Sequence, residues 1–229
     1  MEEKNKGKFA KWFENYWYHY KAQTLIGAVA IFTAVVCTVQ MATKDKYDYY
    51  TIYAGPQILA VQDLTYIQRA IAEVGTDLNN DGAVKVALKD IVMLSPEERQ
   101  AAKEEKDAEF NNGFIQTEMN DYYQQIMAGD AAVMFLSPYM YSQAKESGLF
   151  MPLSEIFDEV PESAYDDCGI TLSKTEFGVS FNGVDDLPED TIVCIRRVTS
   201  FQNMKGSKKA QKEFQQNLDL FKAIVNYTA

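Results

Sequence analysis

The chain has 229 residues, of which 47% are hydrophobic and 24% are charged, a mixture typical of folded globular proteins. Its formal net charge is −11, and it contains a single histidine, His19. The acidic balance argues against nucleic acid as a partner, because nucleic acid is itself a polyanion. One histidine excludes every metal site or catalytic mechanism that needs two imidazole rings.

An uncharged stretch near the N-terminus predicts a membrane-spanning helix. Residues 24–42 carry no charged side chain, and as an α-helix they would extend about 28 Å, close to the thickness of a bilayer's hydrocarbon core. Aromatic residues crowd both ends of this stretch, as they do at membrane interfaces. The lysines before it are Lys4, Lys6, Lys8, Lys11 and Lys21.

The positive-inside rule then predicts three parts for the chain. Residues 1–23 form a cytoplasmic basic and aromatic leader that contacts membrane lipid, and residues 24–42 form a single-pass signal anchor in the cell membrane. Residues 44–229 form an acidic extracellular domain, long enough for one hydrophobic core.

Three other interpretations of the uncharged stretch stay open. A cleaved signal peptide would use the small-residue exit at residues 40–42 (QMA), and a lipoprotein signal would use Cys37. The stretch would otherwise be the buried core helix of a soluble protein. The signal anchor is preferred because the leader is long and rich in aromatic residues.

Beyond the anchor, β-rich and helical patterns alternate along the chain. Predicted strands cover residues 49–54, 83–92, 131–136, 177–181 and 191–198. Predicted helices cover residues 58–74, a segment that starts at Ser95-Pro96, and residues 115–127, 137–147 and 207–227. This order predicts the α/β class, with a mostly parallel sheet and helices on both of its faces.

Two segments carry a resemblance to a known family. Residues 126–136 (IMAGDAAVMFL) and 148–155 (GLFMPLSE) resemble signature segments of the extracellular solute-binding proteins of ABC importers. In that family a helix ends in Gly-Asp before a strand, and a Gly-x-x-x-Pro-Leu turn follows. The resemblance implies one lobe of a periplasmic-binding-protein fold, tethered to the outer face of a membrane and working with an ABC permease or another membrane protein.

Ligand contacts are expected after the strands that end at one edge of the sheet. In open α/β sheets ligands bind beyond the carboxyl ends of strands, here after residues 49–54 and 131–136. The candidate ligand-binding residues there are Gln57, Ser137, Tyr139 and Tyr141. The two tyrosines would offer a ring face and a hydroxyl to a polar solute of the sugar or peptide class, or would simply pack on a neighbouring helix.

A turn-rich segment resembles the start of a calcium loop. Asp77, Asn79 and Asp81 stand at positions one, three and five of such a loop, and Gly82 follows. Position twelve is Leu88, which lacks the bidentate carboxylate that a calcium loop needs. The sequence therefore leaves two possibilities, a calcium site and a metal-free turn built on Asp and Asn side chains.

Cys168 and Cys194 are the cysteines outside the predicted span. An oxidising exterior would permit a disulfide between them, although Cys194 lies in an apolar run typical of a buried free thiol.

The sequence predicts a protein that binds without catalysing a reaction, because no histidine pairs with a serine or cysteine outside the span. The paired acids at Asp166-Asp167 and Asp185-Asp186 are typical of solvated surface, although a hydrolase could use them. The leading hypothesis is capture of a small polar solute for an ABC-type importer. The alternative is a non-catalytic interaction subunit of a membrane complex that has lost ligand binding, favoured by the small outer domain and by Ala131-Ala132 at a usually acidic position.

Overall fold

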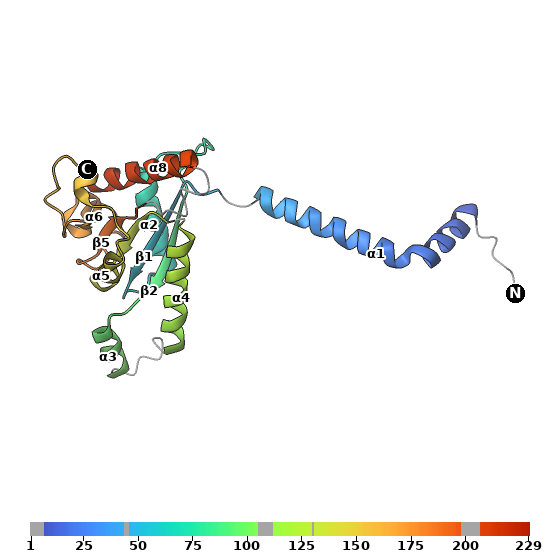
Figure 1. The fold of residues 1–229 in the computed structure, drawn as a ribbon, viewed down its shortest axis with the longest axis horizontal. Coiled ribbons are helices and arrows are strands. Elements are labelled where there is room, and N and C mark those ends of the chain that lie inside the picture. The colour runs from blue at the N-terminus through green and yellow to red at the C-terminus, as the bar shows by residue number, and fades with distance from the viewer. Residues whose placement is uncertain (1–6, 44–45, 105–111, 130, 198–206) are drawn as a thin grey trace. The chain divides into compact units, whose positions relative to one another are not determined.

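A computed structural model of the protein describes residues 7–43, 46–104, 112–129, 131–197 and 207–229. It contains two compact units, Met1–Lys46 and Tyr47–Ala229. The first unit consists mainly of one long helix, and the second holds a sheet with its covering helices (Figure 1).

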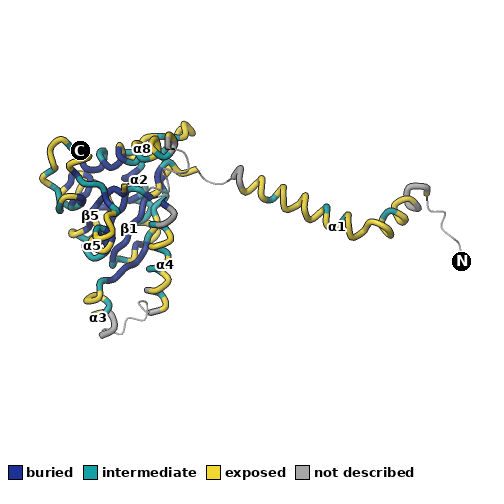
Figure 2. Tube along the Cα trace, in the orientation of Figure 1, coloured by how far each residue is buried: buried dark blue, intermediate teal, exposed yellow. Residues whose placement is uncertain are grey.

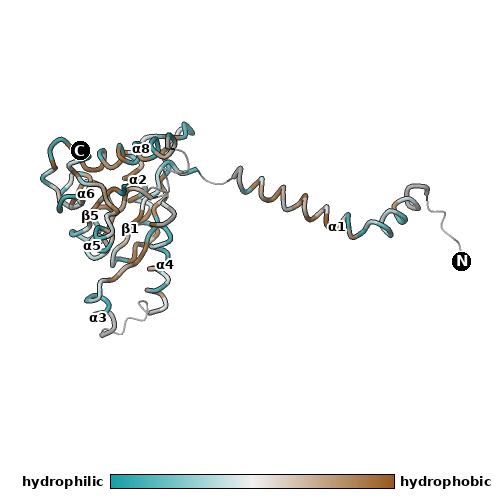
Figure 3. Tube along the Cα trace, in the orientation of Figure 1, coloured by the Kyte–Doolittle hydropathy of each residue, from teal (hydrophilic) through white to brown (hydrophobic). Residues whose placement is uncertain are grey.

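Helix α1 (Lys8–Thr43) includes both the aromatic leader and the uncharged stretch. Its residues Trp12–Gln40 are long and apolar enough to cross a membrane, and the apolar window within them is not buried in the protein. Figure 3 shows the hydrophobic residues concentrated in the longer, C-terminal part of α1. An exposed apolar helix of this kind fits a membrane anchor or a signal sequence and disagrees with the core helix of a soluble protein, which would be buried. The direction in which it crosses stays a prediction.

Five strands form one open sheet in the order β2-β1-β3-β5-β4. The strands are β1 (Tyr49–Gly55), β2 (Val86–Val92), β3 (Val133–Leu136), β4 (Gly169–Thr171) and β5 (Ile192–Ile195). Strand β1 pairs in parallel with β2 and β3, whereas β5 runs antiparallel to its neighbours β3 and β4. The protein is therefore of the mixed α/β class, and β3 is the central strand of a sheet in which β5 alone reverses direction.

Helices cover both faces of the sheet. They are α2 (Val61–Val74), α4 (Asn112–Ala128), α5 (Pro138–Glu146), α6 (Glu176–Ser180) and α8 (Ser207–Val225), with short 3₁₀ turns η2 (Leu153–Glu155) and η3 (Leu172–Lys174). Helix α3 (Pro96–Glu104) instead extends away from the sheet beyond β2 (Figure 1). One core contains Ile67 of α2, Phe177 of α6 and Phe221 of α8, and a second core contains Tyr122 of α4 and Met140 of α5. Figure 2 shows that the strands are largely buried, whereas the helices around them have exposed outer sides.

The predicted strand at residues 177–181 is wrong, since residues 177–180 belong to helix α6 and Phe181 is its C-cap. Thr175 caps the helix, and its hydroxyl oxygen accepts a hydrogen bond from the Gly178 N–H at 3.0 Å. Phe177 and Phe181 lie four residues apart and bring their rings together at 5.0 Å, where both also contact Tyr227. The apolar run that looked like a strand is therefore one helical turn with a cap and a buried face.

Gly178 allows α6 to pack against η3, because a Cβ atom there would overlap the carbonyl oxygen of Leu172. We expect Gly178→Ala to lower the free energy of unfolding by about 1–3 kcal/mol, as overpacking of a core does. The neighbouring Val179→Ala removes an exposed side chain and should change it by less than about 0.5 kcal/mol. Chemical denaturation of the full chain in detergent micelles measures both, and equal stabilities would contradict the packing described.

Candidate functional site

The sheet has a topological switch point between β1 and β3. From β1 the chain crosses to β2 on one side, and then returns to β3 on the other side of β1. The connection that follows β1 and the one that follows β3 therefore lead away in opposite directions. Such a point opens a crevice beyond the carboxyl ends of the strands, where ligands bind in open α/β sheets. Here that place follows Gly55 and Leu136, and we call it the switch-point edge.

Three of the four predicted ligand-binding residues lie at the switch-point edge. Gln57 is half-buried in the loop that follows β1, and Tyr139 is half-buried in the first turn of α5. Ser137 is the N-cap of α5, where its hydroxyl oxygen accepts a hydrogen bond from the Met140 N–H at 3.4 Å. The Ser137 hydroxyl proton remains able to donate to a ligand, because the cap uses only an oxygen lone pair.

Tyr141 has a different place from the one predicted. Its ring is buried and stacks on Phe150, with ring centroids 5.1 Å apart. Its hydroxyl donates to Asp166 Oδ1 at 2.6 Å, next to the beginning of β4 and thus at the opposite, amino edge of the sheet. Tyr141 is therefore a packing residue, which was the other possibility that its sequence context allowed.

Two polar side chains near the switch-point edge were missed by the sequence analysis. Tyr53 is 1% exposed, and its hydroxyl lies near the Gln57 backbone without a hydrogen bond of ordinary geometry to any described residue. Asp90 stands directly opposite Tyr53 in the β1–β2 pairing, and its Oδ1 atom is likewise buried without a partner. Buried polar atoms nearly always have partners, so two neighbouring exceptions mark a place where a further polar group fits.

The Tyr53 side chain points toward the loop that closes this edge. A Cβ atom built on Gly55 would lie 2.5 Å from the Tyr53 hydroxyl oxygen, so the absence of a side chain at Gly55 makes room for the ring. The Leu59 backbone, in the same loop, contributes a hydrogen bond to Asp90. Residues 55–59 thus lie over both unpartnered atoms.

Negative charges surround these two groups. Burial raises the pKa of Tyr53 far above its ordinary range, and the charges of Asp90, Asp190 and Glu98 raise it further. Burial also raises the pKa of Asp90 to about 6, an effect that the Leu59 hydrogen bond partly offsets and the charge of Glu118 increases. The environment therefore favours a group that donates hydrogen bonds or carries positive charge.

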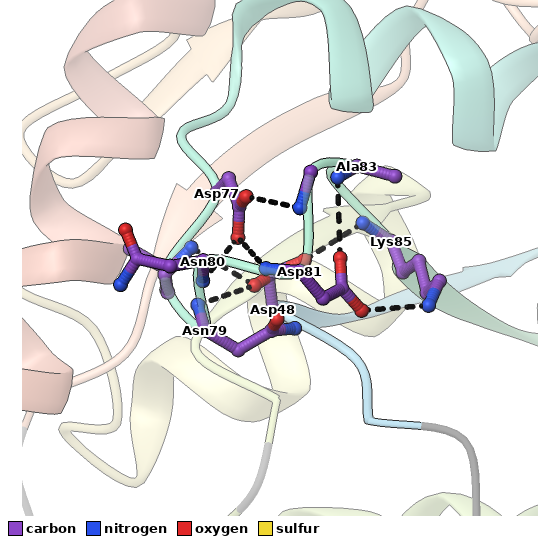
Figure 4. A network of polar contacts seen from close by, with 9 residues as sticks. Asp48, Asp77, Asn79, Asn80, Asp81, Ala83 and Lys85 are labelled. Carbon is purple, nitrogen blue, oxygen red and sulfur yellow. Dashed lines mark hydrogen bonds and ion pairs between the residues drawn. The ribbon is translucent and has the colours of Figure 1, made fainter.

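The calcium-like segment forms a turn held together by hydrogen bonds (Figure 4). The Asp77 carboxylate accepts backbone N–H groups from Asn80 at 2.6 Å and Gly82 at 2.9 Å. Asp81 pairs with Lys85, at 2.7 Å. A metal ion would have to compete with donors that already occupy these oxygen atoms.

Asp48, just before β1, joins this turn to the sheet. Its carboxylate accepts the N–H groups of Leu78, Asn79 and Lys85 at 2.8–3.2 Å. Within the described ranges no three His, Cys, Asp or Glu side chains gather as a metal site. Asp77 and Asp81 thus act as acceptors within the turn itself, and a calcium site at Asp77, Asn79 and Asp81 stays a prediction.

Cys168 and Cys194 are both buried free thiols, so of the two possibilities that the sequence left open the structure has the free thiols. Cys194 lies in β5 opposite Gly169, the residue after Cys168. Burial raises the pKa of both thiols, which makes them poor nucleophiles.

Asp166 connects α5 to the start of β4 at the amino edge of the sheet. Besides the Tyr141 hydroxyl, it accepts the Lys145 ammonium at 2.8 Å and the N–H groups of Cys168 and Gly169. Burial by itself would raise the pKa of Asp166, but these hydrogen bonds outweigh it and hold the pKa below its ordinary value. Asp166 is therefore part of the framework, unlike the exposed Asp185 and Asp186.

An open hollow adjoins this network, lined in part by Lys145, Phe150, Asp167 and Arg197. Lys145 also pairs with Asp167, and Arg197 donates to Glu155 at 3.0 Å and to the Phe150 carbonyl at 2.9 Å. Both cations thus have protein partners already, which makes the hollow a weaker candidate for a ligand than the switch-point edge.

Loss of the Asp77 carboxylate should loosen the turn. We expect Asp77→Ala to reduce the free energy of unfolding by about 1–3 kcal/mol, because several backbone N–H groups lose their acceptor. Asp81→Ala, which removes an exposed ion pair, should cost less. Thermal melts with and without calcium should coincide for the unmodified chain, whereas a higher Tm with calcium would show that the loop rearranges around a metal.

The Asp166 network should make stability depend on pH. Because folding lowers the pKa of Asp166, the stabilisation is present above about pH 4, the unfolded pKa, and is lost as the pH falls through the folded value. Asp166→Asn should therefore be less stable than the unmodified chain at pH 7, and the difference should shrink in acid. Asp185→Asn is the matched control, and an Asp166→Asn variant of full stability at pH 7 would refute this role.

Comparisons of the chain with protein-family models, curated proteins and solved structures found no match.

Proposed function

We propose that the unit Tyr47–Ala229 is a non-enzymatic binding module, tethered to a membrane by α1, that captures a small polar solute at the switch-point edge. The resemblance of residues 126–136 and 148–155 to solute-binding proteins of ABC importers suggests delivery of that solute to a membrane permease. Under the predicted orientation the module stands outside the cell.

The observation that carries this proposal is the pair of buried, unpartnered polar atoms, Tyr53 Oη and Asp90 Oδ1. Leaving such atoms without hydrogen bonds costs about 1–3 kcal/mol each, and proteins keep costly arrangements of this kind at sites where a ligand completes them. The pair lies beside the switch point, where the sheet topology independently favours ligand binding.

The surrounding charges narrow the class of solute. The Tyr53 hydroxyl can donate or accept a hydrogen bond, the ionised Asp90 carboxylate only accepts, and nearby Asp190 and Glu98 add negative charge. A solute with hydroxyl or ammonium donors, such as a sugar, an amino acid or a short peptide, fits these groups better than an anion does.

An interaction subunit without a small ligand is the second candidate. Ile58, in the loop over Tyr53, is 50% exposed, and Val61 at the start of α2 is 81% exposed. Apolar side chains beside a polar site can form the contact surface for another protein. In that case the partner would cover the same edge and supply the missing hydrogen bonds.

A thermal-shift panel of sugars, amino acids and short peptides, applied to the full chain in detergent micelles, tests solute capture. A ligand at a hundred times its Kd adds about 2.7 kcal/mol, which corresponds to a rise in Tm of roughly 5–11 °C. Tyr53→Phe and Asp90→Asn should abolish or reduce that rise, while Asp185→Asn should leave it intact. If the protein melts cooperatively and no compound raises its Tm, solute capture is rejected and the interaction subunit becomes the better account.

In the absence of ligand, Asp90→Asn should stabilise the protein at neutral pH, although the same change should reduce the rise in Tm that a ligand causes. Because folding raises the pKa of Asp90 to about 6, ionising the carboxyl costs stability as the pH rises from about 4 through 6. The Asn variant should therefore melt higher than the unmodified chain at pH 7–8 and equally at pH 4. Melting curves at these pH values measure the difference, and a destabilised variant at pH 8 would show that Asp90 has a structural partner.

A further inference from the structure

The N-terminal part of α1 differs in character from the apolar part that follows. Between residues 12 and 20 the helix carries two columns of aromatic rings. Trp12, Tyr16 and Tyr20 form one column, with ring centroids 5.6 and 5.4 Å apart, and Phe13 and Trp17 form the second, with centroids 6.1 Å apart. We call these five residues the aromatic face.

The aromatic face occupies one side of the helix. At about 100° per residue, its five side chains span an arc of about 140°, and Glu14, Asn15 and Tyr18 point to the other side. Tyr18 is the most exposed of the aromatic residues in the segment, at 77%. The segment is thus amphipathic, whereas the uncharged residues 24–42 are apolar on every side.

The placement of the aromatic residues on one side of the helix indicates how residues 12–20 are oriented in a membrane. A helix that crosses a bilayer upright presents all its sides at the same depth, so nothing favours separating aromatic from polar side chains around it. A helix that lies in the interface needs this separation, since one side faces acyl chains and the other faces water. Tryptophan and tyrosine are also the residues that prefer the headgroup region.

The length of α1 agrees with this distinction. Its 36 residues would extend about 54 Å if straight, well beyond the roughly 30 Å of a hydrocarbon core. Residues 24–42 are long enough to cross the hydrocarbon core of the bilayer, so the aromatic segment is not needed for the crossing. Figure 1 shows α1 bending in its N-terminal part. The Tyr16 hydroxyl and Thr24 Oγ1 are 2.8 Å apart, and this hydrogen bond connects the aromatic face to Thr24, the first residue of the uncharged stretch 24–42.

We propose that residues 12–20 form an interfacial helix that lies in the plane of an anionic phospholipid surface, with the aromatic face in the headgroup and upper acyl region. The five lysines of the leader supply the attraction for acidic headgroups. The anchor therefore has two parts, a span and a membrane-surface arm, and the arm holds the start of the span at a set depth.

The two tryptophans of the chain, Trp12 and Trp17, both lie in the arm and make its depth measurable. The full chain is reconstituted into phosphatidylcholine vesicles containing phosphatidylglycerol, as Trp12→Phe and Trp17→Phe variants that each keep one tryptophan. Fluorescence is then quenched by lipids brominated at different depths along the acyl chain. In-plane placement predicts equal, shallow depths, because the two rings flank the centre of the aromatic face.

An upright helix predicts a different result, since Trp17 comes five positions after Trp12 and therefore lies about 7.5 Å from it along the axis. Depths that differ by that amount, or a lack of quenching at either position, would overturn the proposal. Quenching that is equally strong in vesicles without phosphatidylglycerol would overturn its electrostatic part.

A matched pair of variants tests the aromatic face itself. Replacing Phe13 and Tyr20 together by serine should reduce quenching of both tryptophans, while Tyr18→Ser, on the other side of the helix, should leave it unchanged. Residues 24–42 still hold these variants in the bilayer, so a loss of quenching reports on the arm and is separate from any failure of solute binding. Equal effects of the two changes would count against an oriented face.

Discussion

The domain depends on β1, which is paired in parallel on both sides and buried on both faces. Tyr49 and Tyr53 enter one core and Ile52 and Ala54 the other, so each face needs its own layer of helices. Parallel neighbours require crossover connections, and these carry the chain over the sheet between successive strands. The same connections leave β1 and β3 in opposite directions, and this creates the switch-point edge.

Much of the acidic charge serves the framework. Asp48, Asp77 and Asp166 each accept several backbone N–H groups and hold turns that the sheet itself does not support. Their carboxylates are thereby occupied, and among the described residues no three His, Cys, Asp or Glu side chains gather as a metal site. Asp90 differs from them because one of its oxygen atoms is buried without a partner, and this contrast singles it out.

Local sequence patterns predicted helices and strands well where the spacing of apolar residues fits only one kind of secondary structure. The strand at β1, the start of α3 at Ser95-Pro96 and the end of α5 near Gly148 follow from residue types whose backbone preferences are strong. The pattern failed at residues 177–181, where an apolar run fits a strand and a buried helical turn equally well. Only the contacts of Phe177 with Phe181 and Tyr227 distinguish the two.

The sequence by itself determined that the chain has an apolar helix able to span a membrane and an α/β domain after it, because hydrophobic periodicity and charge are local properties. It also placed Gln57, Ser137 and Tyr139 at one edge of the sheet. Tertiary structure alone decided that β5 reverses direction and that the Tyr141 hydroxyl donates to Asp166. It also decided that Tyr53 and Asp90 lie side by side on β1 and β2, with Tyr53 Oη and Asp90 Oδ1 buried without hydrogen-bond partners. Those outcomes depend on which strands become neighbours. Strand pairing brings together residues that are far apart in the chain, and a local sequence pattern does not predict such contacts.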